Sequence, residues 1–424
     1  MFLLLATGLP IAFAIGGVSA AFAIAFWGVD HLFILAGAAF SNITNINLIA
    51  IPLFVLMGMV MSYTGIADDL YECMYIWLGR LRGGLAIGTV LICTMFAAMT
   101  GSIAAAIITL ATIALPSMLK RGYSRDIAIG SVVAGGLLGV IIPPSILMIV
   151  YSGLSGESIG RLYLGGAVPG LILSALYMTY IGVRSALQPN LCPALPPEEI
   201  GGWKKRLTSL KSIVFPLALI LFVLGSIYSG IVTPVEASAV GATGAFVCAA
   251  IYRRLNWQAL KLALHRTVSI TAFVMWLLMA VGCFSSIYSG IGAPELAKKV
   301  AYILPGGGWG MLIGMQITLI LAGMIMDDFP IIMIFTPVFV PIIKLLGFDT
   351  LWFGVLFMVN MQIALLSPPY GFALIYMRGA VPEGITMLDI YRSVFPFIGL
   401  QLICLILVMA FPTLAHWLPN LIIR

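Results

Sequence analysis

Charged residues are scarce in this chain of 424 residues. Asp, Glu, Lys and Arg together make up 8% of it, whereas hydrophobic residues make up 62%. A soluble domain carries about 25% charged residues, and its core could not bury so much apolar surface. The composition therefore excludes an ordinary soluble domain and indicates a protein whose solvent is the lipid bilayer. At roughly 20 residues per crossing, the chain has room for about ten spanning helices.

Residue types that build catalytic or metal sites are also few. Six scattered cysteines form no C-x-x-C pair, three histidines lie far apart, and the phosphate-binding pattern G-x-x-x-x-G-K-[ST] does not occur. These absences disfavour a zinc site, ATP binding and an intramembrane enzyme, and we expect no cofactor. The net charge of +6 comes from basic residues in short loops between apolar segments, so no nucleic-acid partner is expected.

Two proline-broken apolar segments lie 225 residues apart. Pro143-Pro144-Ser145 in the first corresponds to Pro368-Pro369-Tyr370 in the second. Broken helices at matched positions of two repeats are typical of a transporter's binding site. Further pairs at this offset are Gly65 with Gly290, Gly83 with Gly308, Pro116 with Pro341, Gly122 with Gly347, and Tyr151 with Tyr376.

The predicted fold class is an all-α polytopic membrane protein with two inverted-topology repeats. We expect repeat 1 at residues 1–184, a cytoplasmic linker at 185–212 and repeat 2 at 213–424. Gly8-Leu9-Pro10 matches Val232-Thr233-Pro234, so we expect the first helix to be retained and not cleaved as a signal peptide. Spans are predicted near 3–27, 47–63, 127–151, 163–184, 213–230, 234–252, 267–289, 350–376 and 390–412.

Two further apolar stretches are interrupted and do not fit as simple crossings. Residues 85–116 contain Met99-Thr100-Gly101-Ser102, and residues 310–341 contain Asp327-Asp328-Phe329-Pro330. Each arm of about 15 residues is too short to span a bilayer, so we predict two re-entrant helical hairpins. The broken helices are expected at about 127–155 and 350–377. Segments 66–82 and 292–304 mix charged and apolar residues, which favours amphipathic helices at the membrane interface.

The basic residues set the expected orientation. With the N-terminus in the cytoplasm and the C-terminus outside, 16 of the 21 Lys and Arg residues lie on the cytoplasmic side, as the positive-inside rule requires. The first hairpin then opens from the cytoplasm and the second from the outside. The two repeats are therefore expected to be inverted relative to each other.

The first candidate site combines Thr100 and Ser102 with the loop Gly139–Ser145. A hairpin tip and a Pro-Pro break both free backbone carbonyls from helical hydrogen bonds. These carbonyls and two hydroxyls suit a hard, singly charged cation such as sodium. The alternative is a simple helix kink whose hydroxyls donate to the carbonyl four residues earlier.

The second candidate site combines Asp327 and Asp328 with the loop Ala364–Gly371. An Asp at the bilayer centre costs about 2.5–3.5 kcal/mol on insertion scales, and a bound cation would offset that cost. The alternative is that both carboxylates cap a helix in a wet crevice. Which of the two faces an ion stays open.

Helix N-termini follow both tips and both breaks, and their N–H groups favour an anion. We therefore expect an anionic substrate between the two tips, beside sodium. Arg378 is either a contact for a substrate carboxylate or an anchor at the membrane surface. Glu236 is expected to bind backbone N–H groups at the start of its helix.

The chain resembles the large membrane (M) subunit of tripartite ATP-independent periplasmic (TRAP) transporters, within the wider ion transporter superfamily. The resemblance covers nearly all residues. Its most specific parts are Gly135-Gly136-Leu137-Leu138-Gly139 leading to Pro143-Pro144-Ser145, Thr100-Gly101-Ser102, Thr233-Pro234-Val235-Glu236-Ala237, and Ser367-Pro368-Pro369-Tyr370-Gly371-Phe372.

The resemblance implies sodium-coupled secondary uptake of a small carboxylate or sulfonate in the bacterial cytoplasmic (inner) membrane. A periplasmic substrate-binding protein would deliver the anion, and a small four-helix membrane subunit (Q type) would be a separate chain packed on the scaffold. In this elevator mechanism a transport domain, residues of about 83–160 and 308–380, moves along the remaining scaffold. A stand-alone sodium-coupled anion symporter of the same superfamily is the alternative.

The same resemblance and the matched breaks define the expected ligands. Carried over from the family, the sodium ligands of the first site fall on Thr100, Ser102, Gly139, Ile142 and Pro144, several through backbone carbonyls. The second site is expected to use Asp327, Asp328, Ala364, Ser367 and Pro369. Substrate contacts are expected at Ser145, Tyr370 and Arg378.

Overall fold

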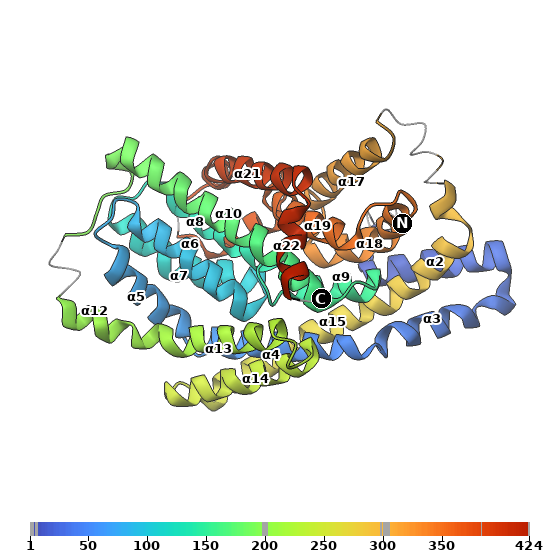
Figure 1. The fold of residues 1–424 in the computed structure, drawn as a ribbon, viewed down its shortest axis with the longest axis horizontal. Coiled ribbons are helices and arrows are strands. Elements are labelled where there is room, and N and C mark those ends of the chain that lie inside the picture. Colours follow the sequence, from blue (N-terminus) through green and yellow to red (C-terminus); the bar gives the residue numbers. More distant parts are fainter. Residues whose placement is uncertain are drawn as a thin grey trace.

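The computed structural model describes residues 4, 7–196, 202–296, 299, 306–382 and 384–422, and over these residues it contains helices and no strand. Figure 1 shows the helices arranged side by side in an elongated molecule. The elements of the first half are α2 (Ile11–Trp27), η1 (Val29–His31), α3 (Phe33–Ile43), η2 (Ile46–Ile49), α4 (Ala50–Tyr63), α5 (Ile66–Leu78), α6 (Gly84–Thr100), α7 (Ile103–Lys120), α8 (Arg125–Gly136), η3 (Leu137–Val140), α9 (Ile146–Ser155), α10 (Ile159–Leu187) and η4 (Pro189–Leu191).

The second half repeats much of this order. Its elements are α12 (Trp203–Ser209), α13 (Lys211–Tyr228), α14 (Pro234–Ile251), α15 (Trp257–Gly290), α17 (Gly307–Gly323), α18 (Asp328–Leu345), α19 (Thr350–Leu366), α20 (Phe372–Ala380), α21 (Met387–Ala410) and α22 (Thr413–Ile422).

Eight segments of the described chain are long and apolar enough to cross a bilayer. This confirms the all-helical, multi-pass part of the expected fold class. By length and composition α7 and α18 count among the eight, although the sequence predicts both as arms of re-entrant hairpins. Their companions α6 and α17 are 17 residues each, short of the roughly 20 residues that a perpendicular crossing needs.

Several boundaries differ from those expected. The sequence prediction missed α3 and α22, and it placed the start of α15 ten residues too late. The expected linker at 185–212 is partly helical, because α10 extends into it and α12 occupies its end. Of the two expected interfacial helices, α5 forms at Ile66–Leu78, whereas most of 292–304 lies outside the described residues.

Glu236 caps its own helix, as expected. Its carboxylate accepts the Thr233 backbone N–H at 2.7 Å, while the Thr233 hydroxyl accepts the Glu236 N–H at 3.3 Å. This reciprocal pair is a capping box, and Pro234 occupies the first helical position, where its missing N–H costs nothing. The role of Glu236 is therefore structural.

The helices pack in two groups. In the first, which we call the α4 group, α15 packs on α2, α3 and α4, and α14 packs on α4 and α13. In the second, the tip group, α6 to α10 pack with one another and with α17 to α22. In Figure 1 the α4 group lies along the lower edge of the molecule. Helix α5 joins the groups through contacts with α6 on one side and with α12 and α13 on the other.

The assignment of α10 and α21 to a static scaffold stays a prediction. In the fold, α21 packs chiefly on α8 and α19, and α10 packs on α6, α19 and α22. The reason is burial. Every residue of α19 from Leu351 to Leu366 is buried, as is α8 from Ile127 onward, and a helix that is apolar all round needs neighbours on every side. Helices α10 and α21 supply the missing neighbours.

The two halves make reciprocal contacts. Helix α9 of the first half packs on α18 of the second, and α20 of the second packs on α7 of the first. By the sequence offset, α2 corresponds to α14 and α4 corresponds to α15. These pairs also make reciprocal contacts, because α14 packs on α4 and α2 packs on α15. The element lengths also agree, since α6 and α17 have 17 residues and α7 and α18 have 18.

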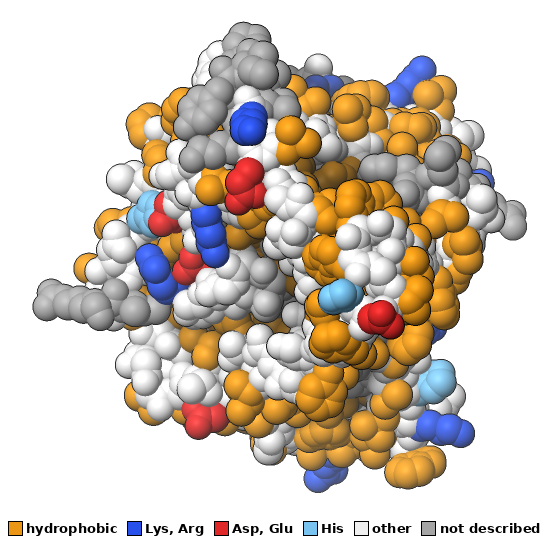
Figure 2. Space-filling view, turned by 90° about the vertical axis from the view of Figure 1, so that its right-hand side faces the viewer, with side chains coloured by type: hydrophobic (Ala, Val, Ile, Leu, Met, Phe, Trp, Pro, Cys, Tyr) orange, Lys and Arg blue, Asp and Glu red, His pale blue; other side chains and the backbone are white. Residues whose placement is uncertain are grey.

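Large apolar side chains cover much of the outer surface. Figure 2 shows one face on which hydrophobic side chains predominate and charged ones are scattered. Exposed examples include Phe13, Phe26, Leu221, Phe222 and Ile406. Contiguous apolar surface of this extent marks contact with a membrane or a partner, which agrees with the spans read from the sequence.

Candidate functional site

The first helix pair turns through two residues. Helix α6 ends at Thr100, Gly101 takes a left-handed conformation (φ +55°), and Ser102 caps α7 by accepting the Ala105 N–H at 3.5 Å. The Thr100 hydroxyl donates to the Phe96 carbonyl at 3.0 Å. That bond is the arrangement expected for a simple kink, but it leaves the oxygen lone pairs of Thr100 available as acceptors.

The first tip lies against the first Pro-Pro break. A Cβ placed on Gly101 would be 3.0 Å from the carbonyl oxygen of Pro144, and one on Gly139 would be 3.8 Å from Ala97 of α6. Between η3 and α9 the chain leaves helical geometry, and the Ser145 hydroxyl donates to the Val140 carbonyl at 2.7 Å. The carbonyl oxygen of Pro144 therefore lies beside Gly101, the residue between the two hydroxyl-bearing residues of the tip.

The second helix pair turns at residues 324–327, so Asp328 to Pro330 form the first turn of α18 and not the tip itself. Asp327 caps α18. One of its carboxylate oxygens accepts the Asp328 N–H at 2.9 Å, and the other accepts the Tyr376 hydroxyl of α20 at 2.8 Å. The Asp328 carboxylate accepts the Phe329 N–H at 2.8 Å. Both carboxylates are half-buried and rest on N–H groups at the positive end of α18.

The second tip lies against the second break in the same way. A Cβ on Gly323, at the end of α17, would be 2.2 Å from the Cβ of Ala364, so only glycine fits there. The Ser367 hydroxyl donates to the Ile363 carbonyl at 2.7 Å. Gly371 then adopts φ +38° before α20 begins. Each half thus brings its own tip and break together.

Both tips border one cavity of about 210 Å³. Ser102 comes from the first tip, Asp327 and Asp328 come from the second, and Tyr376 reaches the cavity from α20. Met59 of α4 and Phe273 of α15 form the side that belongs to the α4 group. The cavity therefore lies between the tip group and the α4 group. Its other lining residues are Gly101, Ile103, Ala104, Ile146, Leu147, Ile270 and Phe329.

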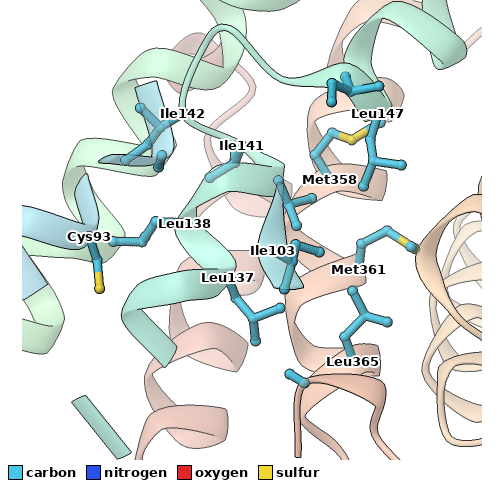
Figure 3. Close-up of a cluster of buried hydrophobic side chains, with 14 of the residues drawn as sticks. Cys93, Ile103, Leu137, Leu138, Ile141, Ile142, Leu147, Met358, Met361 and Leu365 are labelled. Atoms are coloured by element: carbon cyan, nitrogen blue, oxygen red, sulfur yellow. The ribbon is translucent and has the colours of Figure 1, made fainter. Parts of the chain in front are cut away.

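On the side of the tip group, a cluster of buried hydrophobic side chains packs behind the cavity lining. Figure 3 shows Ile103 at the start of α7 together with Leu137 and Ile141 of the first break and Met358 and Met361 of α19. All five are buried. Close-packed interiors transmit strain, so this core couples the first tip and the first break to α19.

The predicted ligands divide into three sets. Ser102, Asp327 and Asp328 line the cavity. A second set lies buried at the tips and breaks but outside the lining: Thr100, Gly139, Ile142, Pro144, Ser145, Ala364 and Ser367. A third set, Pro369, Tyr370 and Arg378, is exposed and borders no part of this cavity.

Two of the expected substrate contacts have other surroundings. The Arg378 guanidinium donates to the Ile385 carbonyl in the turn before α21. Tyr370 is 59% exposed. The sequence prediction missed Tyr376 as a site residue, although it belongs to the matched pair Tyr151 and Tyr376. The Tyr151 hydroxyl bonds the Thr350 carbonyl at 3.0 Å, whereas Tyr376 bonds a carboxylate.

The donor set suits a hard cation more than a transition metal. Within the described residues no group of three His, Cys, Asp or Glu side chains converges. The oxygens near the tips are carbonyls, hydroxyls and two carboxylates, and such ligands suit hard cations. The candidate site is formed by several residues together.

Comparison with known proteins adds to this geometry. The model of the family "Tripartite ATP-independent periplasmic transporter, DctM component" matches residues 1–414. The C4-dicarboxylate TRAP transporter large permease protein DctM of Pseudomonas aeruginosa is 34% identical over 408 residues, covering 95% of this chain and 93% of the relative. The isethionate TRAP transporter permease protein DctMQ of Oleidesulfovibrio alaskensis is 29% identical, covering 97% of this chain and 64% of the relative.

Among solved structures, the YdaH transporter of Alcanivorax borkumensis superposes with a TM-score of 0.66 at 15% identity, covering 96% of this chain and 98% of that one. At this identity the likeness concerns the fold alone.

Proposed function

The chain belongs to the DctM component family of tripartite ATP-independent periplasmic transporters, and from that premise we propose that it takes up a small organic anion in symport with sodium. It is a transporter permease and not an enzyme. The substrate class we propose is a carboxylate or a sulfonate. A C4-dicarboxylate relative and an isethionate relative support that class.

The observation that carries the proposal is the shared cavity of the two tips. It brings Ser102 from one half together with Asp327 and Asp328 from the other. Two half-buried carboxylates repel each other, and a bound cation offsets both that repulsion and the cost of placing them at membrane depth. We assign sodium to the tips and the anion to the space between them, where the first turns of α7 and α18 present N–H groups.

We further propose that the two halves are inverted repeats with re-entrant hairpins. The matched element lengths and the reciprocal contacts of α9 with α18 and of α20 with α7 support this. Both tips belong to one packed group, so the site moves as a unit in an elevator motion. In this proposal the moving unit is the whole tip group, including α10 and α21, and the α4 group is the scaffold.

The proposal includes two partners and a location. A periplasmic binding protein delivers the anion, and a small four-helix membrane subunit packs on the scaffold in the bacterial inner membrane. The fused name of the DctMQ relative supports the second partner. The exposed apolar surface of the α4 group, for example Phe22 and Phe26 on α2, offers it area. The N-terminus is proposed to be cytoplasmic and the C-terminus periplasmic.

Reconstitution with and without partners tests this function. Proteoliposomes that contain the chain and its small subunit should take up labelled succinate or isethionate when the binding protein is present outside. Uptake should fall to background when the binding protein is omitted. Equal uptake without the binding protein would favour the stand-alone symporter instead. No uptake of any small carboxylate or sulfonate with all partners present would contradict the proposed substrate class.

A further inference from the structure

A second cavity of about 430 Å³ adjoins the cavity of the two tips. The two share Met59, Ser102, Ala104 and Ile270 in their linings. The second cavity runs between α7 of the tip group and α4 and α15 of the α4 group. A molecule that leaves the tips between the two groups therefore enters this second cavity.

The charges along the two cavities are ordered. Asp327 and Asp328 are the charged side chains of the first lining, and Arg266 of α15 is the charged side chain of the second. The hydroxyl groups of Ser62, Tyr63 and Thr109 lie in the same lining as Arg266. A cation is thus favoured at one end of the path and an anion at the other.

Arg266 lines the second cavity and is itself exposed. None of the salt bridges found among the described residues involves Arg266. Arginine presents a planar fork of donors that matches a carboxylate, and it carries its charge at every physiological pH. An arginine at a cavity wall raises the local concentration of anions, because low-dielectric walls focus its field.

We propose that Arg266 receives the anionic substrate where the path between the two groups opens. This inference rests on the proposed function, which it deepens by naming the residue that attracts the anion after it leaves the tips. The competing interpretation is that Arg266 only anchors α15 at the membrane surface, as basic residues near helix ends commonly do. The two interpretations differ in what Arg266 does to an anion inside the cavity.

A cysteine reporter separates them without a transported substrate. Thr109 lines the same cavity as Arg266, and a Thr109→Cys variant can be labelled with two thiol reagents of similar size. One is 2-sulfonatoethyl methanethiosulfonate, itself a small sulfonate, and the other is its trimethylammonium counterpart. Five of the six native cysteines are buried, and the parent chain without the reporter gives the background rate. The quantity measured is the ratio of the anionic to the cationic labelling rate.

Adding Arg266→Gln should lower this ratio by about threefold or more, since steering by a focused charge changes encounter rates by up to 10–10³-fold. Arg266→Lys keeps the charge and should preserve most of the ratio, which shows that the reporter site is intact. Lys261→Gln is the matched control, because Lys261 is an exposed cation on the same helix outside the cavity lining.

Each outcome decides the proposal. An unchanged ratio in Arg266→Gln, or an equal fall in Lys261→Gln, would overturn it and leave Arg266 as a surface anchor. A fall in both Arg266→Gln and Arg266→Lys would assign the effect to altered cavity shape, which also overturns the proposal. Failure of sodium-coupled uptake would contradict the proposed function while leaving the labelling ratio as it is.

Discussion

At the scale of single residues, the two aspartates of the second tip have unequal surroundings. Both carboxylate oxygens of Asp327 accept hydrogen bonds, one of them from Tyr376, whereas Asp328 accepts at one oxygen from Phe329. The sequence could not choose between them, because adjacent carboxylates look alike until the path of the chain is known. Tyr376 fixes the orientation of Asp327 from another helix.

Loss of oxygen ligands at the tips should weaken sodium dependence. We expect Ser102→Ala and Asp327→Asn each to raise the sodium concentration needed for half-maximal uptake. The carboxylate change should have the larger effect, because charge-assisted contacts are roughly twice as strong as neutral ones. Asp349→Asn is the control, since Asp349 caps α19 through the Trp352 N–H at 2.8 Å and lies outside the cavity lining. Wild-type sodium affinity in both tip variants would contradict the two-tip site.

The close contact between the first tip and α4 depends on Gly58. A Cβ on Gly58 would lie 2.6 Å from both the Cα and the carbonyl oxygen of Thr100, which are backbone atoms that cannot rotate away. Gly58→Ala should therefore disfavour this arrangement of the two groups and reduce uptake several-fold. The measurement is initial uptake rate normalised to protein in the liposomes.

Gly225→Ala provides the control for that change. Gly225 lies inside α13, and nothing is within 4 Å of a Cβ built there, so this substitution should be neutral or stabilise by about 0.4–1 kcal/mol. If Gly58→Ala transports as well as Gly225→Ala, the contact between tip and α4 is not needed in the transport cycle.

At the scale of helices, the sequence predicted the positions of helix breaks more accurately than the lengths of the helices. The first tip and both Pro-Pro breaks were located to within a few residues, because proline and glycine restrict the backbone locally. The second tip was predicted a few residues too late in the chain. The pattern Asp327-Asp328-Phe329-Pro330 fits both a loop and the first turn of a helix. Asp327 is the cap and Asp328 the first helical residue.

The missed helix α3 has a different cause. Polar residues such as Asn42 lie at its C-terminal end, and the sequence prediction placed no span between 27 and 47. In the fold, the Asn42 amide donates to the Leu278 carbonyl of α15 at 3.1 Å, and a Cβ on Gly282 would lie 2.5 Å from the same amide nitrogen. Contacts across 236 residues of sequence satisfy the polar group, and local pattern cannot reveal them.

The capping box at the start of α14 should stabilise the α4 group. Thr233→Ala removes the hydroxyl that accepts the Glu236 N–H and should destabilise by about 1 kcal/mol, seen as a lower unfolding temperature in detergent. Thr243→Ala in the middle of the same helix should have a smaller effect, because its hydroxyl only bonds back to Ala239. Equal losses would mean that the cap adds nothing to stability.

At the scale of the whole molecule, the structure shows which helices bury the broken ones, and the sequence alone does not. Offsets in the sequence related the two halves, but they could not tell which helices would cover the broken ones. The structure packs α21 on α8 and α10 on α19. Both tips therefore share one packed group with α10 and α21, which lie mostly outside the predicted transport domain of 83–160 plus 308–380.

Movement of one group along the other can be tested by cross-linking. Met59 of α4 and Ala104 of α7 both line the cavities between the groups. A short thiol-specific cross-linker between Met59→Cys and Ala104→Cys should stop uptake, and cleaving the linker should restore it. Ala12→Cys paired with native Cys283 is the control inside the α4 group, where both residues line one cavity. Uptake that survives the first cross-link would exclude an elevator motion of these groups.

Coupling of uptake to sodium can be tested with an ion gradient. Proteoliposomes with all partners are given an inward sodium gradient, and the accumulated anion is compared with that in liposomes where choline replaces sodium. We expect accumulation above the external concentration with sodium and none with choline, without any need for ATP. Undiminished uptake in choline would contradict sodium coupling.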